Sequence, residues 1–326
     1  MYGVNRPRDD PSRDTQHSSY TRDVSFNTNA SVNAPHNSPL AVEPTLPFDN
    51  GEFRTMDVRS WEDPRPVTVG EARFKTPSCY TRAVLLGLSE LDLDILRIRA
   101  EVRTIADDRA ILNLTTWADT VHYLSGCSWL SLPLNDPDIQ WGRYSTTEDR
   151  PPSPLQQKTS RRITFGRPYA APPRVAVWLD SADSGPEKNV RVAAFADDVT
   201  REGFTVHLDA WGDSHLYSAG ATWLAHSDGR QDMRSGAFEI EDVRPASAPC
   251  HQNRGRVSWG PPAMARPPRV FAALRMLDFG HGRHTRIRMK TEEITETGMT
   301  WSFESWADTV FYQAGAVFIA FEGSEW

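Results

Sequence analysis

Cysteine is scarce in this chain, as are the features of disulfide-rich, zinc-binding and membrane-spanning proteins. The 326 residues include three cysteines, Cys79, Cys127 and Cys250. An odd and small number cannot build a disulfide framework, and their spacing matches no zinc motif. No apolar run is long enough to span a bilayer. We therefore expect no membrane insertion, no metal site and no cofactor.

Positive charge is also in short supply. The formal net charge is -7, and no basic stripe is present that could follow a phosphate backbone. We therefore expect no nucleic-acid partner. The first residues lack the apolar centre of a secretory signal. This favours a cytoplasmic protein, or one exported by a route that uses no signal.

Repeated acid–base pairs are missing too. General acid–base catalysis needs positioned ionisable groups, but no such pair recurs at a spacing repeated along the chain. Asp278, His281 and His284 could be drawn as metal ligands, yet they lie in one short stretch and have no counterparts elsewhere. We therefore expect a protein that is not an enzyme.

Residues 1–47 contain little that could form a core. They are rich in Asn, Ser, Thr, Pro, Arg and Asp and show no hydrophobic period. Such a composition buries too little apolar surface to offset the entropy lost on ordering. The segment is predicted to be a disordered tail, which serves either no specific role or as a tether or partner-binding arm.

What the chain has in abundance is internal repetition. Three segments, starting at Arg109, Gly203 and Gly298, align without gaps. Each contains a tryptophan, an aspartate two residues later and a tyrosine six residues later. These are the turn tryptophans (Trp117, Trp211, Trp306), the turn aspartates (Asp119, Asp213, Asp308) and the site tyrosines (Tyr123, Tyr217, Tyr312). A ring closes each segment, at Trp129, Trp223 and Phe318.

Residues upstream keep the same register. The strand arginines (Arg97, Arg191, Arg286) stand 20 residues before the turn tryptophans. Pro-Pro-Arg-Val occurs at Pro172 and Pro267, and the first copy keeps Arg82-Ala83-Val84 there. A glycine begins each copy, 23 residues before an aromatic residue: Gly51 and Phe74, Gly142 and Phe165, Gly236 and Trp259. The predicted repeats are residues 48–135, 136–229 and 230–326.

The pattern within each repeat is typical of strands. Phe204, Val206 and Leu208 share one parity, and the polar residues between them share the other. Period two indicates strands with one buried face, and Pro, Gly and Asp-Asp pairs separate them. Each repeat yields about six such strands. The predicted fold is all-β: three tandem six-stranded antiparallel β-sandwiches after a disordered N-terminal tail.

The turn tryptophans fall on the polar parity. Trp211 continues the series of Thr205, His207 and Asp209. A ring at a strand end that faces away from the core suits the C–H-rich face of a pyranose. Alternatively, the turn tryptophans pack against a neighbouring repeat, and the strand arginines form surface ion pairs with the turn aspartates.

The whole set, arginine, W-x-D-[ST], tyrosine and A-G-x-x-W, resembles the H-type lectin domain in three copies. This resemblance implies six-stranded sandwiches that assemble in threes and bind galactose or N-acetylgalactosamine in clefts between protomers. It implies that the strand arginines, turn tryptophans and site tyrosines bind carbohydrate, with Asp119, Gly212, Asp213 and Asp308 in support. The sequence departs from the family after the tryptophan, where Ala118, Gly212 and Ala307 replace a histidine. The loop that holds the family's sugar-binding aspartate is shorter here.

Three copies in one chain lead to a further hypothesis. The connections near Leu134–Ile139 and Ser227–Arg234 are short, so one chain could fold as its own pseudo-threefold trimer. Leu130, Leu224, Val317 and Ile319 would then line an inner seam. The resemblance implies a multivalent lectin with glycan partners, suited to agglutination or cell adhesion. The alternative is a structural or protein-interaction scaffold that has lost sugar binding.

Overall fold

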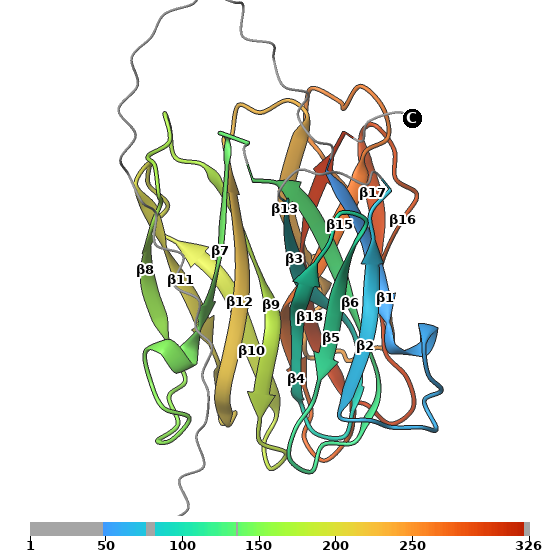
Figure 1. Ribbon diagram of the computed structural model, residues 1–326. Coiled ribbons are helices and arrows are strands. Elements are labelled where there is room, and N and C mark those ends of the chain that lie inside the picture. Colours follow the sequence, from blue (N-terminus) through green and yellow to red (C-terminus); the bar gives the residue numbers. More distant parts are fainter. Residues whose placement is uncertain (1–47, 76–81, 135, 323–326) are drawn as a thin grey trace, which may run out of the picture. The chain divides into compact units, whose positions relative to one another are not determined.

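The computed structural model describes residues 48–75, 82–134 and 136–322. The predicted disordered tail, residues 1–47, and Cys79 lie outside these described residues. Within them the regular secondary structure is antiparallel strand, apart from three single turns of 3-10 helix (Figure 1). The prediction of an all-β fold is confirmed.

Each predicted repeat has the same order of elements: one strand, one 3-10 turn, then five strands. The first repeat contains β1 (Asp49–Arg54), η1 (Thr55–Asp57), β2 (Val67–Arg73), β3 (Arg82–Leu93), β4 (Arg97–Ile105), β5 (Arg109–Thr115) and β6 (His122–Pro133). The second contains β7 (Ile139–Ser145), η2 (Thr146–Glu148), β8 (Ser160–Thr164), β9 (Arg174–Ser184), β10 (Val190–Asp197), β11 (Gly203–Asp209) and β12 (Leu216–His226). The third contains β13 (Met233–Glu239), η3 (Ile240–Asp242), β14 (Gln252–Ser258), β15 (Arg269–Phe279), β16 (Thr285–Glu292), β17 (Gly298–Glu304) and β18 (Phe311–Phe321).

A repeated packing motif holds the two layers of each sandwich together. The aromatic residue that follows each opening glycine meets the ring that closes the repeat, with centroids 6.1 Å apart for Phe74 and Trp129 and 5.2 Å apart for Trp259 and Phe318. The glycine lies against the same ring, since a Cβ on Gly51 would come within 2.7 Å of Trp129. Gly142 and Gly236 stand in the same relation to Trp223 and Phe318. The spacing of 23 residues between the opening glycine and the aromatic residue therefore reflects one packing contact that occurs in all three repeats.

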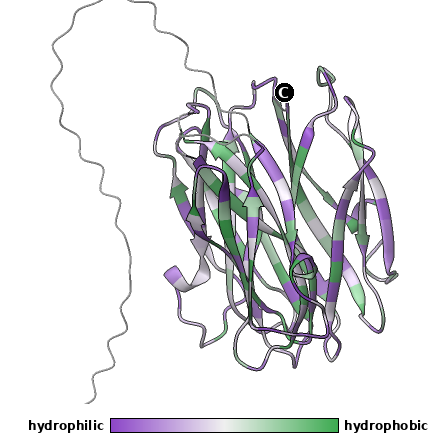
Figure 2. Cartoon of the chain, turned by 45° about the vertical axis from the view of Figure 1, so that its right-hand side comes forward, coloured by the Kyte–Doolittle hydropathy of each residue, from purple (hydrophilic) through white to green (hydrophobic). Residues whose placement is uncertain are grey.

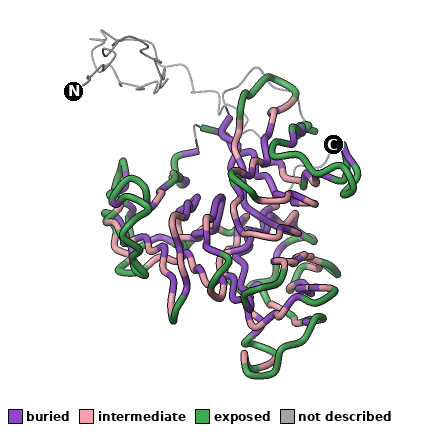
Figure 3. Tube along the Cα trace, turned by 90° about the horizontal axis from the view of Figure 1, so that it is seen from below, coloured by how far each residue is buried: buried purple, intermediate pink, exposed green. Residues whose placement is uncertain are grey.

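The strands alternate between buried and exposed residues as their period predicts. Phe204, Val206 and Leu208 are fully buried, whereas Thr205 and His207 are only partly covered. Figure 2 shows hydrophobic and hydrophilic positions alternating along the strands. In Figure 3 the exposed residues gather in peripheral loops and the buried ones in the strands. This pattern places one face of each strand in the core of its own repeat.

The sheets cross the repeat boundaries. Each of the three six-stranded sheets takes three strands from one repeat and three from another, in the orders β1-β6-β3-β16-β17-β14, β13-β18-β15-β10-β11-β8 and β2-β5-β4-β9-β12-β7. The joining pairs are β4 with β9, β10 with β15, and β16 with β3, all antiparallel. The third pair returns from the last repeat to the first. Every repeat is thus hydrogen-bonded through its main chain to both of the others.

A second apolar core lies where the repeats meet. It is built from the faces of β3, β6, β9, β12, β15 and β18 that point away from the repeats' own cores, and it contains the four residues expected at an inner seam: Leu130, Leu224, Val317 and Ile319. Strands β3, β9 and β15 are therefore covered on both faces. This explains why apolar residues occupy both parities of these strands.

Unequal residues meet at one level of this second core. The three repeats have different residues at one equivalent position, namely Gly87, Trp178 and Ala273. The position is equivalent because its strand partner in each repeat stands eleven residues after the turn tryptophan. A Cβ on Gly87 would lie 2.3 Å from Ala273 Cβ and 2.5 Å from Trp178 Cδ1. The indole Nε1 of Trp178 donates to the carbonyl of Leu86 at 2.8 Å. One repeat supplies a large ring here, and the other two leave it room.

Substitution of Gly87 tests this packing. Gly87→Ala forces a methyl group into occupied space, and overpacking costs about 1–3 kcal/mol of unfolding free energy. The measurement is urea denaturation followed by tryptophan fluorescence. Gly229→Ala is the matched control, because nothing lies within 4 Å of a Cβ there. Equal midpoints for the two variants would contradict the close approach of the three strands.

Candidate functional site: composite clefts between repeats

The W-x-D segments form turns at the ends of β5, β11 and β17. The amide of Thr120 donates to the carbonyl of Trp117 at 3.3 Å, and the other two repeats make the same bond. The residue after each tryptophan has a positive φ: 54° at Ala118, 64° at Gly212 and 56° at Ala307. This left-handed conformation is uncommon for residues other than glycine. The turn leaves each tryptophan half-buried, with part of its ring in solvent.

Each strand arginine binds the turn aspartate of its own repeat. Arg191 Nη1 donates to Asp213 at 2.9 Å, Arg286 Nη1 donates to Asp308 at 2.7 Å, and Arg97 binds Asp119 in the same way. The hydrogen bond from Arg97 lowers the pKa of Asp119, and that from Arg286 lowers the pKa of Asp308. The ion pairs considered as an alternative from the sequence are therefore formed.

A second aspartate reaches each arginine from the next repeat. We call these the seam aspartates (Asp92, Asp183, Asp278). Arg191 Nε lies 3.2 Å from Asp278, and Arg286 Nε lies 3.2 Å from Asp92. Arg97 Nε lies 3.4 Å from Asp183. Burial raises the pKa of Asp183 and of Asp278, although the arginines oppose this effect. Each guanidinium thus lies between two carboxylates from different repeats.

Sequence reasoning missed the seam aspartates. They occupy the same level of the β-ladder, opposite Leu124, Ser218 and Gln313, each seven residues after its turn tryptophan. Along the chain, however, they precede the strand arginines by five residues in the first repeat and eight in the others. The shorter loop in the first repeat hides the equivalence in a gap-free alignment.

The tryptophan of the first repeat also contacts its neighbour. Trp117 Nε1 donates to Asp183 of the second repeat at 3.2 Å. The guanidinium of Arg99 lies over the ring, 5.8 Å from its centroid. The sequence left open that the turn tryptophans pack against a neighbouring repeat. For Trp117 the structure contains such a contact. The ring nevertheless remains half-buried rather than enclosed.

The tyrosine of the first repeat lies beside the third repeat. Tyr123 stacks on His284 with centroids 5.2 Å apart. The adjacent residue, Leu124, lines a cleft together with Arg286 and Trp306. Arg286 and Trp306 of the third repeat thus share this cleft with Asp92 and Leu124 of the first, while Tyr123 stacks on His284.

This cleft between the third and first repeats has a volume of about 490 Å³. Its walls come from both repeats: Trp61, Asp92, Leu124, Arg286, Arg288, Glu304, Trp306 and Ala307. The size lies in the range of small-molecule sites, roughly 300–1,000 Å³. The structure therefore places a strand arginine, a turn tryptophan and a seam aspartate together in one ligand-sized hollow.

A further set of arginines holds the tyrosine segments in place. The clasp arginines (Arg59, Arg150, Arg244) donate to the main-chain carbonyl oxygens of Tyr123, Tyr217 and Tyr312 at 2.9, 3.1 and 2.9 Å. They also donate to the carbonyl of the residue before each tyrosine. The sequence held a signal for them, since each stands eight residues after an opening glycine.

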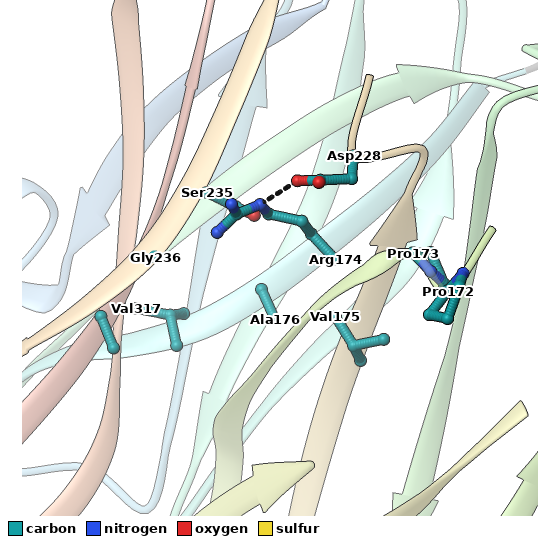
Figure 4. A pocket seen from close by; sticks show the side chains of 10 residues that line it. Pro172, Pro173, Arg174, Val175, Ala176, Asp228, Ser235, Gly236 and Val317 are labelled. Carbon is teal, nitrogen blue, oxygen red and sulfur yellow. Dashed lines mark hydrogen bonds and ion pairs between the residues drawn. The ribbon is translucent and has the colours of Figure 1, made fainter. Parts of the chain in front are cut away.

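A hollow of similar size between the second and third repeats has a different lining. It is bordered by Pro172, Pro173, Ser235 and Val317, and by an ion pair of 2.5 Å between Arg174 and Asp228 (Figure 4). No aromatic ring and none of the predicted site residues lines it. It therefore lacks the stacking surface that the cleft at Trp306 provides.

The described part of the chain supports neither a metal site nor a membrane-spanning helix. The suggested ligands Asp278, His281 and His284 turn to different partners, namely Arg191, Asn189 and Asp92, and no group of three metal-ligating side chains occurs among the described residues. None of the described helices has the length and hydropathy needed to cross a membrane.

Comparison with known families agrees with this architecture. The family model described as the H-type lectin domain matches residues 160–226 and 262–321. These two segments belong to the H-type lectin domain family. They contain the strand arginine, turn tryptophan and site tyrosine of the second and third repeats. The first repeat lies outside the matched segments but shares their order of elements and sheet pairing.

Individual proteins show more distant likenesses. The chain is 33% identical over 70 residues to the "ATP synthase subunits region ORF 7" protein of Fuscovulum blasticum, a match that covers 22% of this chain and 61% of that protein. Two structures of discoidin II from Dictyostelium discoideum align with TM-scores of 0.25 and 0.24 at 13% and 12% identity. They cover 45% and 48% of this chain, and 73% and 76% of theirs. The TM-scores are too low to support an inference.

Removal of a clasp arginine should destabilise the fold. Arg150→Met deprives the carbonyls of Tyr217 and Leu216 of their donor, and we expect a loss of about 2–4 kcal/mol of unfolding free energy. Urea denaturation measures this loss. Arg162→Met is the control, because Arg162 is exposed and its partners can turn to water. A loss no larger than that of the control would contradict the clasp.

The stability of the chain should fall in weak acid because of His122. Burial, with the nearby charge of Arg59, lowers the pKa of His122 to about 4. Between pH 6.5 and 4 the unfolded chain therefore binds a proton that the folded chain excludes, and stability falls as the pH falls. The loss at pH 5 is about 2 kcal/mol. His122→Gln should flatten the profile of unfolding free energy against pH, whereas a profile parallel to the wild type would refute this cause.

Proposed function

We propose that the chain is a multivalent lectin that binds galactose or N-acetylgalactosamine-type glycans without transforming them. The observation that carries this proposal is the recurrence of one constellation at all three repeat boundaries. At each boundary a strand arginine lies between a turn aspartate of its own repeat and a seam aspartate of the next, and a half-buried tryptophan follows in the same turn. The match of two segments to the H-type lectin domain supports it.

The constellation suits a neutral sugar. An indole face packs against the C–H groups of a pyranose, and carboxylate and guanidinium groups hydrogen-bond to its hydroxyls. Since two aspartates flank each arginine, the site carries no surplus positive charge. An anionic sugar would meet like charge, which is costly in a binding site. Neutral glycans are therefore the class that we propose.

We further propose that one chain forms the complete pseudo-threefold unit. Three observations support this: the shared sheets, the return pairing of β16 with β3, and the second apolar core that contains Leu130 and Leu224. Three sites in one rigid unit would raise the avidity for a surface with many glycans. Agglutination or cell adhesion would follow from such avidity.

The second candidate function is a scaffold without sugar binding. It is favoured by the ion pairs of the strand arginines, which are already satisfied by aspartates and join neighbouring repeats. On this view the constellation stabilises the boundary between repeats and has no ligand. The scaffold predicts that no glycan binds and that the turn tryptophans can be replaced without effect on binding.

A glycan array separates the two functions. The wild type should bind galactose-type or N-acetylgalactosamine-type glycans at neutral pH, and a Trp117/Trp211/Trp306→Ala variant should lose that binding. Loss of one stacked ring costs about 2 kcal/mol, or roughly 30-fold in Kd, at each site. Trp141→Ala is the matched control, because Trp141 is 41% exposed and lies on β7, outside the constellation. Silence of the folded wild type would favour the scaffold.

A further inference from the structure

The cleft between the third and first repeats contains a second tryptophan. Trp61 lines the same hollow of about 490 Å³ as Trp306. Half of its side chain, 51%, is exposed. The two rings come from different repeats, Trp306 from the turn after β17 and Trp61 from the loop after η1. Both rings thus contribute to the lining of one cleft.

A clasp arginine holds the loop that carries Trp61. Arg59 Nη1 donates to the carbonyls of Ser60 and Asp63 at 3.1 and 3.2 Å. The same atom donates to the carbonyl of Tyr123, the residue before Leu124, which lines the cleft. The amide of Asp63 also closes a turn onto the carbonyl of Ser60. Trp61 therefore projects from a loop that is hydrogen-bonded on both sides of the ring.

The corresponding positions in the other repeats are not aromatic. Two residues after the clasp arginines stand Trp61, Pro152 and Ala246. A second position is also apolar in the first repeat and polar in the others. The residues opposite the seam aspartates are Leu124, Ser218 and Gln313. Only the cleft at Trp306 combines the ring with the aliphatic side chain. At these two positions the cleft at Trp306 is therefore lined by apolar side chains, whereas the other two boundaries have smaller or polar residues there.

The charged groups of this cleft are already paired. Arg286 binds Asp92 and Asp308, Glu304 binds Lys290 at 2.7 Å, and Arg288 binds Glu90. A ligand that enters the cleft therefore meets ring faces and satisfied ion pairs rather than a free charge. Neutral molecules with a flat C–H face fit such walls better than anions or cations do.

We propose that Trp61 is a specificity-determining residue that gives the cleft between the third and first repeats a second sugar subsite. One pyranose of a neutral disaccharide or longer glycan stacks on Trp306, and the next residue packs against Trp61. A volume of this size accommodates a drug-sized ligand, which is larger than one sugar ring. The inference rests on the proposed lectin function.

The test isolates this cleft in the full-length chain. In a Trp117→Ala/Trp211→Ala background only the cleft at Trp306 keeps its turn tryptophan. Trp61→Ala is added to one sample and Trp141→Ala to a matched control. Titration calorimetry measures the Kd of methyl galactoside, of lactose and of N-acetyllactosamine. Circular dichroism melting confirms that all variants are folded.

Trp61→Ala should weaken both disaccharides about five- to tenfold and leave the monosaccharide within twofold, because the second residue loses its stacking surface. Trp141→Ala should change neither. An equal effect on monosaccharide and disaccharides, or no effect on either, overturns the second subsite while the lectin function stands. Failure of the folded wild type to bind any of the three sugars refutes the lectin function and the subsite together.

Discussion

The structure depends on the antiparallel pairing of strand edges between repeats. Within one repeat each layer has three strands, and a short sheet of this kind leaves an edge with unpaired amide and carbonyl groups. The edges at β4, β10 and β16 are completed by β9, β15 and β3. The ladder opposes Arg97 to Asp183, Arg191 to Asp278 and Arg286 to Asp92. Main-chain bonds and ion pairs therefore join the repeats at the same points.

The three arginine–aspartate constellations and the cleft at Trp306 follow from this pairing. Because each sheet passes from one repeat into the next, the arginine and tryptophan of one repeat meet the aspartate of another. The clasp arginines set the path of the tyrosine segments beside these points. A single repeat would therefore lack the seam aspartate that its strand arginine binds.

Joining the repeats in one chain removes the need for them to be identical. Gly87, Trp178 and Ala273 fill one level of the shared core with residues of very different size. Trp61, Pro152 and Ala246 differ in the same way at the clefts. A symmetric trimer must use one residue three times at such positions. The single chain can give each boundary its own packing and its own binding surface.

Much of the fold could be predicted from the residues. The strands of the all-β fold were predicted correctly because period two is a feature of neighbouring residues. Leu130 and Leu224, predicted for an inner seam, lie in the second apolar core. The alignment of the first repeat with the other two was wrong by one residue in β3. The sequence aligned Arg82 with Arg174 and Arg269, whereas in the β-ladder Ala83 is the residue level with them. The first repeat has a shorter loop, and only the hydrogen-bond register shows where that difference falls.

The sequence by itself determined the all-β class, the threefold repetition, the positions of arginine, tryptophan and tyrosine, and the likeness to H-type lectins. Only the tertiary structure decided which repeat completes which sheet, and therefore which aspartate meets which arginine and that Trp61 joins Trp306. The physical reason is that strand alternation is encoded in neighbouring residues. Pairing between edges such as β16 and β3, which lie about 200 residues apart, depends on how three cores pack together.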